Sequence, residues 1–374
     1  MQIGRKLLEV ISAVLTAAET KRADAALREA LRDSDLSPSE KATVTHLVFS
    51  YFRWLGWLDR SKPLRAQLEV VDELVETFAA NPAHFRDEEL IERGLPAWVR
   101  EHVPVTADLV RAFQSQPMLW LRAQLGQARQ LASELGNAEL HKHVADAICY
   151  EGNDDLFRSA AFHKGKFEVQ DLSSQAVGHV CNPTPGETWW DVCAGEGGKT
   201  LHLCDLMQNK GLVWASDPAE WRLEKLKRRA SRAKLFNYRA KPWVQKDQLP
   251  IKTKFDGVLV DAPCSGVGTW GRNPHARWTT TQKDVAELAE LQRGLLEKIA
   301  NSVKLGGKLI YSVCTMTKAE TSDIAQHFNE THAEFEPFAV KNPIQPALAG
   351  VEIMMLPQKV RANGMYIVAW RRRA

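Results

Sequence analysis

The chain has 374 residues, 44% of them apolar and 25% charged, with a formal net charge of +3. These values are typical of a folded globular protein of two or three domains, and the small charge excess identifies no partner. Six cysteines without a Cys-x-x-Cys pair predict neither a disulfide framework nor a zinc site. Because no apolar run is long enough for a bilayer and no signal peptide is evident, we expect a cytoplasmic protein without a membrane segment.

The first part of the chain predicts helices. Apolar residues recur at helical spacing over 3–32, 44–58 and 64–80. The segment Ser37–Glu40 marks a helix start, because serine and an early proline favour the first turn. Nothing here alternates as a strand does, so we expect an all-α bundle over 1–92.

The next segment, 93–182, mixes both patterns. We interpret it as a small α+β subdomain. Its expected elements are strands over 120–124, 147–150 and 167–170 and a helix over 127–135.

From residue 183 to 374, short apolar strands alternate with turns and helices. This alternation predicts a parallel, doubly wound sheet with helices on both faces, in which ligands bind at the carboxyl ends of the strands. The expected strands are 188–192, 212–216, 243–245, 256–260, 308–313 and a closing strand at 364–370. One expected helix follows the first strand and ends near 207, and the others cover 221–234, 283–303 and 320–329.

A glycine-rich turn, Cys193–Lys199, follows the first of these strands. Its glycines let the backbone approach a ligand, and the helix that follows offers free N–H groups to a carboxylate or phosphate. A phosphate-binding P-loop is the alternative. Gly198-Lys199-Thr200 fits the end of that pattern, but Cys193 stands where the pattern needs its first glycine.

Two acids extend this turn into a nucleoside site. Asp217 ends the second strand, where a carboxylate can accept from both hydroxyls of a ribose. Asp247 follows the third expected strand, where it can accept from an adenine amino group. The pattern therefore predicts an adenosine-containing ligand, and does not separate a dinucleotide from S-adenosylmethionine.

Two cysteines, Cys264 and Cys314, come at the ends of the fourth and fifth expected strands. If those strands are neighbours, both thiols face one pocket. A thiolate that adds to C6 of a pyrimidine makes C5 reactive toward the methyl group of a sulfonium, and a second thiol can assist the elimination that follows. Asp261, close to Cys264, can hold or protonate N3 of cytosine. The cysteine pair therefore favours S-adenosylmethionine.

These residues carry a resemblance to a known family. Over about residues 94–374 the sequence resembles the Nop/Sun family of RNA cytosine-5 methyltransferases, which includes the bacterial small-subunit rRNA enzymes. The N-terminal helices resemble, more weakly, the NusB-like RNA-binding domain of those enzymes, and the middle segment resembles their small RNA-binding subdomain. The matching blocks are Val169–Gln175, Asp191–Thr200, Asp261–Gly266 with Arg272, Pro274 and Trp278, Tyr311–Thr315 with Glu320, and Gly364-Met365-Tyr366.

The resemblance implies a Rossmann-like class I methyltransferase domain over 183–374 that uses S-adenosylmethionine. It implies that Cys314 is the nucleophile, that Cys264 helps to release the product, and that Asp261 and Lys199 lie beside the target base. The implied cofactor-binding residues are Cys193, Ala194, Gly195, Glu196, Gly197, Gly198, Lys199, Asp217, Arg222, Asp247 and Asp261. The expected partner is small-subunit rRNA, with tRNA as the alternative, and we expect a monomer without a metal.

One departure from the family bears on activity. Glu196 stands where the family usually has proline, and it either weakens cofactor binding or turns to solvent. A chain that does not bind the cofactor would be a non-catalytic RNA-binding paralogue. Amino-group methylation at Asp261-Ala262-Pro263 is a further alternative, but it leaves both cysteines unexplained.

Several weaker features are expected to be structural. Trp270 and Trp278 flank the catalytic loop, where packing is the expected role and base stacking the alternative. The basic helix over 222–234 is expected to be a solvated face. His179 and His275 have no metal-ligand companions in the sequence.

Overall fold

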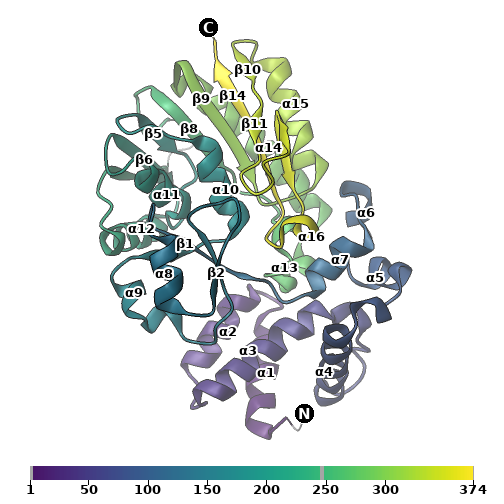
Figure 1. Ribbon diagram of the computed structural model, residues 1–374. Helices are drawn as coiled ribbons and strands as arrows, with labels where there is room; N and C mark the ends of the chain where they lie inside the picture. Colours follow the sequence, from purple (N-terminus) through teal and green to yellow (C-terminus); the bar gives the residue numbers. More distant parts are fainter. Residues whose placement is uncertain (1–2, 245–247, 374) are drawn as a thin grey trace. The chain divides into compact units, whose positions relative to one another are not determined.

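The computed structural model describes residues 3–244 and 248–373 (Figure 1). The chain divides into two compact units. The helical unit comprises Met1–Pro117 and Thr269–Gln282, and the sheet unit comprises Met118–Gly268 and Lys283–Ala374. Within the described ranges, no helix combines the length and the apolar character needed to cross a membrane. The division at residues 92 and 182 that the sequence suggests stays a prediction.

The helical unit contains the helices that the apolar spacing predicted over 3–32, 44–58 and 64–80, together with further helices that it did not predict. They are α1 (Arg5–Ala17), α2 (Ala23–Arg32), α3 (Pro38–Arg53), α4 (Leu64–Ala80), α5 (Asp87–Arg93), α6 (Val99–His102), α7 (Ala107–Gln114) and α13 (Pro274–Thr279), with 3-10 turns at Leu55–Trp57 and Pro82–His84. A capping box starts α3: Ser37 Oγ accepts from Glu40 N–H at 3.3 Å, and Glu40 Oε2 accepts from Ser37 N–H at 2.8 Å. These bonds satisfy two N–H groups that a helix start leaves free.

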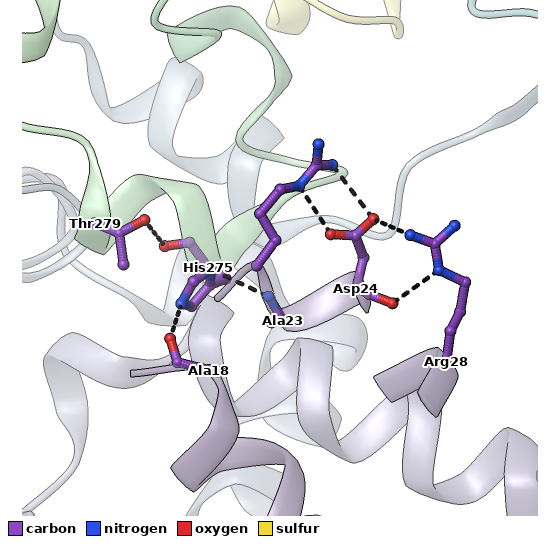
Figure 2. Close-up of polar contacts among 7 residues, drawn as sticks. Ala18, Ala23, Asp24, Arg28, His275 and Thr279 are labelled. Atoms are coloured by element: carbon purple, nitrogen blue, oxygen red, sulfur yellow. Dashed lines mark hydrogen bonds and ion pairs between the residues drawn. The ribbon is translucent and has the colours of Figure 1, made fainter. Parts of the chain in front are cut away.

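Residues 269–282 belong to the helical unit although they follow the strand that leads to Cys264. Their helix α13 packs on α3. The ring of His275 lies between the end of α1 and the start of α2 (Figure 2): Nδ1 accepts from Ala23 N–H at 3.4 Å, and Nε2 lies 3.0 Å from the Ala18 carbonyl oxygen. These two contacts need the neutral ring with its proton on Nε2.

The main sheet of the sheet unit has the strand order β10-β14-β9-β8-β5-β6-β7, and β13 pairs with β14. Strands β7, β6, β5, β8 and β9 run parallel, so their carboxyl ends share one edge of the sheet. The strands are β5 (Thr188–Asp191), β6 (Leu212–Asp217), β7 (Tyr238–Pro242), β8 (Phe255–Asp261), β9 (Val303–Val313), β10 (Phe335–Pro337), β13 (Glu352–Met355) and β14 (Met365–Arg372), with a small pair of β11 (Val340–Lys341) and β12 (Ala349–Gly350).

Helices cover both faces of this sheet, as predicted. Successive residues show it: Trp189 lies in a core with Leu172 and Leu201, whereas Trp190 lies in a second core with Leu296. The helices on the two faces are α10 (Leu172–Cys181), α11 (Gly198–Leu206), α12 (Glu220–Ala233), α14 (Gln282–Ile299) and α15 (Ser322–Thr331).

Two strand predictions were wrong. The closing strand exists, but β14 runs antiparallel to β9, because the chain reaches it from β13 through the short helix α16 (Pro357–Val360) rather than through a long crossover helix. The third strand is β7, which ends before the predicted strand 243–245. Its half-exposed residues at the sheet edge form no apolar run. Gln245 lies outside the described residues.

A second sheet, antiparallel and of order β2-β3-β1-β4, lies in the same unit. Its strands β1 (Leu119–Ala123), β3 (Ala147–Tyr150) and β4 (Phe167–Val169), with the helix α8 (Ala128–Leu135), confirm the elements predicted there, and β2 (Ala138–Leu140) is a strand that the sequence did not predict. Ion pairs tie this sheet to the helices of the main sheet. Arg122 pairs with Asp205 of α11 at 3.0 Å, and Glu168 pairs with Arg229 and Arg232 of α12.

The contacts of His275 predict a pH-dependent stability. Burial lowers the pKa of His275, although the Ala18 carbonyl and Asp24 oppose the shift and Arg22 adds to it. The unfolded chain therefore binds this proton more readily, and stability is lost as the pH falls through about 6.5 toward the lower folded pKa. We expect the drop in melting temperature between about pH 7.5 and 5.5 to be smaller by about 2 °C or more in His275→Gln, which keeps a donor and an acceptor but does not titrate.

Thermal melts of both proteins across this pH range measure the effect. Parallel curves for wild type and His275→Gln would show that the ring does not change its protonation on folding.

Candidate active site

The turn after β5 is shaped by two glycines in the left-handed region. Gly195 has φ +54° and Gly197 has φ +87°. A Cβ atom at Gly197 would lie 2.4 Å from Leu226 Cγ, so no larger residue fits there without displacing α12. Ala194 N–H donates to the Ser216 carbonyl at 2.8 Å, which ties the turn to the end of β6. The backbone is thus held at the carboxyl edge of the sheet, directly before the start of α11.

Asp217, at the end of β6, is held against this turn and is only 3% exposed. One carboxylate oxygen accepts from Gly195 N–H at 3.1 Å and lies 3.5 Å from Arg222 Nη1, and the other accepts from Ala219 N–H at 2.8 Å. The orientation of the carboxylate is therefore fixed. A carboxylate oxygen accepts more than one hydrogen bond, so capacity remains for hydroxyl groups of a ligand.

Glu196, the departure from the family pattern, has a partner for its charge. Its Oε1 lies 2.7 Å from Lys225 Nζ, and its carbonyl oxygen accepts from Arg229 Nη1 at 2.8 Å. The ion pair is partly exposed on both sides. The negative charge that replaces the proline is therefore balanced by α12 rather than left beside the turn.

A buried ion pair joins α11 to the end of β8. Lys199 Nζ lies 2.6 Å from Asp261 Oδ2, and Asp261 Oδ1 accepts from Ser312 Oγ at 2.8 Å. Burial by itself would lower the pKa of Lys199, but the charge of Asp261 outweighs it and the net shift is upward. Lys199 therefore carries a positive charge at neutral pH and holds one oxygen of Asp261.

The thiols of Cys264 and Cys314 lie 3.4 Å apart, both half-buried. Strands β8 and β9 are paired so that Asp261 faces Ser312, and each cysteine follows shortly after its strand. The separation is a contact distance and not a disulfide bond. The hydrogen bond to Cys314, followed by burial, raises the pKa of Cys264 well above its usual range. Either sulfur atom can be the donor in this contact.

One buried carboxylate ties the two cysteine loops together. Glu320 is fully buried and accepts from five donors. Oε1 accepts from Ser265 N–H at 2.8 Å and from Gln292 Nε2 at 3.1 Å. Oε2 accepts from the hydroxyls of Ser265, Thr315 and Thr317. Because Ser265 follows Cys264 and Thr315 follows Cys314, the position of each thiol depends on this carboxylate.

A further acid lies beneath the turn. Asp191, at the end of β5, is buried, and its Oδ2 accepts from Thr200 Oγ1 at 2.6 Å. Burial raises the pKa of Asp191 to about 7. No role was predicted for Asp191 or Glu320, although both lie in motif blocks. The sequence carried a signal for each residue: Asp191 is an acid at the end of an apolar strand, and Glu320 is an acid shortly after the Cys314 loop.

The structure thus brings most of the predicted site residues together at one edge of the sheet. The turn is formed by Cys193–Lys199, and beside it lie Asp217 and Arg222. At the ends of β8 and β9 lie Asp261, Cys264 and Cys314. Asp247 lies outside the described residues. The catalytic and cofactor-binding roles of these residues stay predictions.

The two tryptophans of the catalytic loop lie in the helical unit. Trp270 is fully buried and packs against Trp98 and Phe113. Trp278 Nε1 donates to the Phe52 carbonyl oxygen at 2.7 Å. Trp270 therefore has the packing role that was expected and has no face available for a base.

The fold and the site define a class of protein. A parallel sheet of order β7-β6-β5-β8-β9 with an antiparallel last strand β14, and a glycine-rich turn after its first strand, is the arrangement of a class I methyltransferase. The family described as 16S rRNA methyltransferase RsmB/F matches residues 179–371. Since this match covers more than half of the chain, the protein belongs to that family.

Individual relatives agree with this assignment. The probable ribosomal RNA small subunit methyltransferase B of Synechocystis sp. is 39% identical over 215 residues, which cover 55% of this chain and 48% of the relative. The chain therefore spans about half the length of this curated relative. The crystal structure of PH0851 has a TM-score of 0.83 and 25% identity over 100% of both chains. The structure of NSun6 from Pyrococcus horikoshii with SFG has a TM-score of 0.63 over 71% of this chain and 94% of its own, and at 17% identity it shows the fold alone.

The hydrogen bonds of Glu320 predict what its substitution does. Glu320→Gln removes the charge that strengthens three hydroxyl bonds, each bond to a charged group being worth about 1.5–3 kcal/mol. We expect alkylation of Cys264 and Cys314 by iodoacetamide to become about fivefold faster, because the loops open about 1 kcal/mol more easily. Peptide mass spectrometry of time-resolved labelling measures both rates.

Glu297→Gln is the matched control, since Glu297 is an exposed glutamate of α14. Equal labelling rates in the two variants would contradict a role of Glu320 in holding the thiols.

Proposed function

We propose that this protein methylates C5 of cytosine in RNA with S-adenosylmethionine as the methyl donor, and that its substrate is small-subunit rRNA. The observation that carries the proposal is the 3.4 Å separation of the Cys264 and Cys314 sulfur atoms, at the strand ends that also hold the Lys199–Asp261 pair. Family membership supports methyl transfer to rRNA. A substrate of this kind would place the enzyme in the cytoplasm, and we propose that it acts as a monomer.

The residues around the turn fit S-adenosylmethionine. Asp217 has a fixed carboxylate with capacity for ribose hydroxyls, and the start of α11 presents N–H groups that suit the carboxylate of the cofactor. The fold neighbour NSun6 was solved with SFG, an analogue of this cofactor. When bound, S-adenosylmethionine would supply an electrophilic methyl group.

In the proposed reaction Cys314 acts first. Its thiol releases a proton, and the sulfur bonds to C6 of the cytosine while the electron pair of the C5–C6 double bond moves into the ring. Asp261 takes this proton and passes it to N3, which stabilises the ring, and Lys199, 2.6 Å away, stabilises the carboxylate before and after the transfer. C5 is then nucleophilic enough to bond the methyl group, whose bond to the sulfonium sulfur would break and leave a neutral thioether.

Cys264 acts in the second half. Its sulfur atom lies 3.4 Å from that of the nucleophile, close enough to reach the same cytosine, and it acts as the base after its own proton has passed to solvent. Cys264 takes the proton from C5, the C5–C6 double bond forms again, and the bond between C6 and Cys314 breaks. N3 returns its proton to Asp261, and the thiolate of Cys314 is free. The target cytosine must be unpaired or flipped out of a helix for this attack.

The nucleotide-hydrolase alternative has less support. In a P-loop the lysine of the Gly-Lys-Thr sequence must reach phosphates. Here Lys199 is paired with Asp261 and buried. A Cys193 in place of the first glycine adds to the mismatch.

Trapping tests the division of labour between the cysteines. With S-adenosylmethionine and total small-subunit RNA, Cys264→Ala should accumulate a covalent protein–RNA adduct that survives denaturing electrophoresis, because the adduct forms but is not resolved. Cys314→Ala should form no adduct and should lose methyl transfer by at least about a thousandfold.

Cys149→Ser, a cysteine of β3 away from the site, controls for the loss of a thiol. Full activity of Cys314→Ala would refute the covalent mechanism. Bisulfite sequencing of the RNA identifies the methylated base.

The ion pair of Glu196 predicts that this residue does not impair the cofactor site. Since Lys225 balances its charge and partly exposed pairs contribute at most about 1 kcal/mol, Glu196→Gln should change the dissociation constant of S-adenosylmethionine by less than about fivefold. Isothermal titration calorimetry measures both proteins. If the wild type does not bind while Glu196→Pro does, the chain is a non-catalytic paralogue.

A further inference from the structure

The helical unit contains a cavity that the proposed chemistry does not use. It has a volume of about 750 Å³ and lies between one face of α3 and the second half of α4, closed at one side by residues 114–117 and by Arg272. All of its lining residues belong to the helical unit. A volume of this size suits a ligand of a few tens of atoms.

The charges around this cavity have one sign. Its lining includes Arg53 and Arg272, and no aspartate or glutamate. Among residues 3–244 and 248–373, no carboxylate forms an ion pair with Arg53 or Arg272. The side chain of Arg272 is exposed, whereas Arg53 is only 8% exposed. The cavity therefore presents guanidinium groups whose charge the described part of the protein leaves unbalanced.

The hydrogen bonds of Arg53 are also incomplete. Nη2 donates to the Gly271 carbonyl oxygen at 3.1 Å, but Nε has no partner among the described residues. The neighbouring Ser50, one turn earlier on α3 and 1% exposed, likewise has no described partner for its Oγ. Buried donors without an acceptor are uncommon in folded proteins. An anionic oxygen in the cavity would supply the acceptor that this guanidinium lacks.

A second buried cation lies behind the first. Arg277 is fully buried and donates to the carbonyl oxygens of Arg53, Gly94 and Phe113 and to Gln114 Oε1, at distances of 2.8–3.3 Å. These oxygens accept from Nη1 and Nη2 but carry no full negative charge, and Nε has no partner among the described residues. Two guanidinium groups in one buried region raise the electrostatic potential there, which favours an anion in the adjoining cavity.

The rest of the lining is apolar and aromatic. Phe49 is half-buried, and Trp54 and Phe78 line the same cavity. Aromatic rings beside unpaired guanidinium groups match the two parts of a nucleotide, because a base stacks on a ring and a phosphate accepts from arginine. We propose that this cavity binds an unpaired nucleotide of the RNA substrate, with Arg53 and Arg272 on its phosphate and Phe49 against its base. The proposal rests on RNA being the substrate.

Binding of RNA to the full-length protein tests the proposal. The probe is a short, fluorescein-labelled single-stranded RNA, and fluorescence anisotropy gives its dissociation constant at several salt concentrations. Arg272→Gln should weaken binding by about fivefold or more and reduce the slope of log K against log salt by about 1. Phe49→Ala should weaken binding by a similar factor without changing the slope.

The control is Arg60→Gln, an exposed arginine of the helical unit outside the cavity, which should change binding by less than about twofold. Thermal melts confirm that each variant is folded. Wild-type affinity of both Arg272→Gln and Phe49→Ala would overturn the proposal.

Two further binding experiments distinguish a nucleotide from other ligands of this cavity. An RNA of the same length with abasic residues should lose the dependence on Phe49, and unchanged dependence would mean that the cavity recognises no base. Poly-glutamate that displaces the RNA in wild type but not in Arg272→Gln would indicate an acidic peptide instead. A methyl-transfer assay on the same proteins tests the proposed function separately from the proposed binding cavity. If the wild type binds RNA through this cavity but methylates none, the proposed function is refuted and the binding proposal is retained.

Discussion

The pairing of β8 with β9 is the constraint on which the candidate site depends. Parallel neighbours deliver their carboxyl ends to the same edge, and the register that places Asp261 opposite Ser312 sets where the two chains leave the sheet. Cys264 and Cys314 follow at nearly equal distances from that register, so their thiols meet although 50 residues separate them in sequence. A shift of one residue in this pairing would turn one side chain to the other face of the sheet.

Register alone does not fix a thiol on a loop, and the buried Glu320 supplies the remaining restraint. A charged group without a counter-charge is tolerated in a protein interior only when its hydrogen bonds are complete, and five donors complete them here. Two of those donors belong to Ser265, next to Cys264, and one to Thr315, next to Cys314. The same carboxylate therefore couples the position of Cys314 to that of Cys264.

The segment between β8 and α14 contributes residues to both units. Its first residues form the Cys264 loop of the sheet unit, and its later residues, 269–282, are anchored in the helical unit by Arg277 and His275. Neither anchor uses a carboxylate. Each donates to main-chain carbonyl oxygens at helix ends or loops, where such oxygens have no partner within their own helix. Among the described residues the charge of Arg277 has no carboxylate partner, which supports the proposal that an anion binds in the cavity of this unit.

The sequence by itself determined the class of fold, the helical character of the first segment, and the pairing of two cysteines with an acid at strand ends, because periodicity, capping residues and strand–turn–helix order are local signals. Only the tertiary structure decided the antiparallel direction of β14, the edge position of β7, the balance of Glu196 by Lys225 and the central place of Glu320. It also showed that Arg277 is fully buried in the helical unit. Each of these depends on which distant residues become neighbours, and that information is absent from any local pattern.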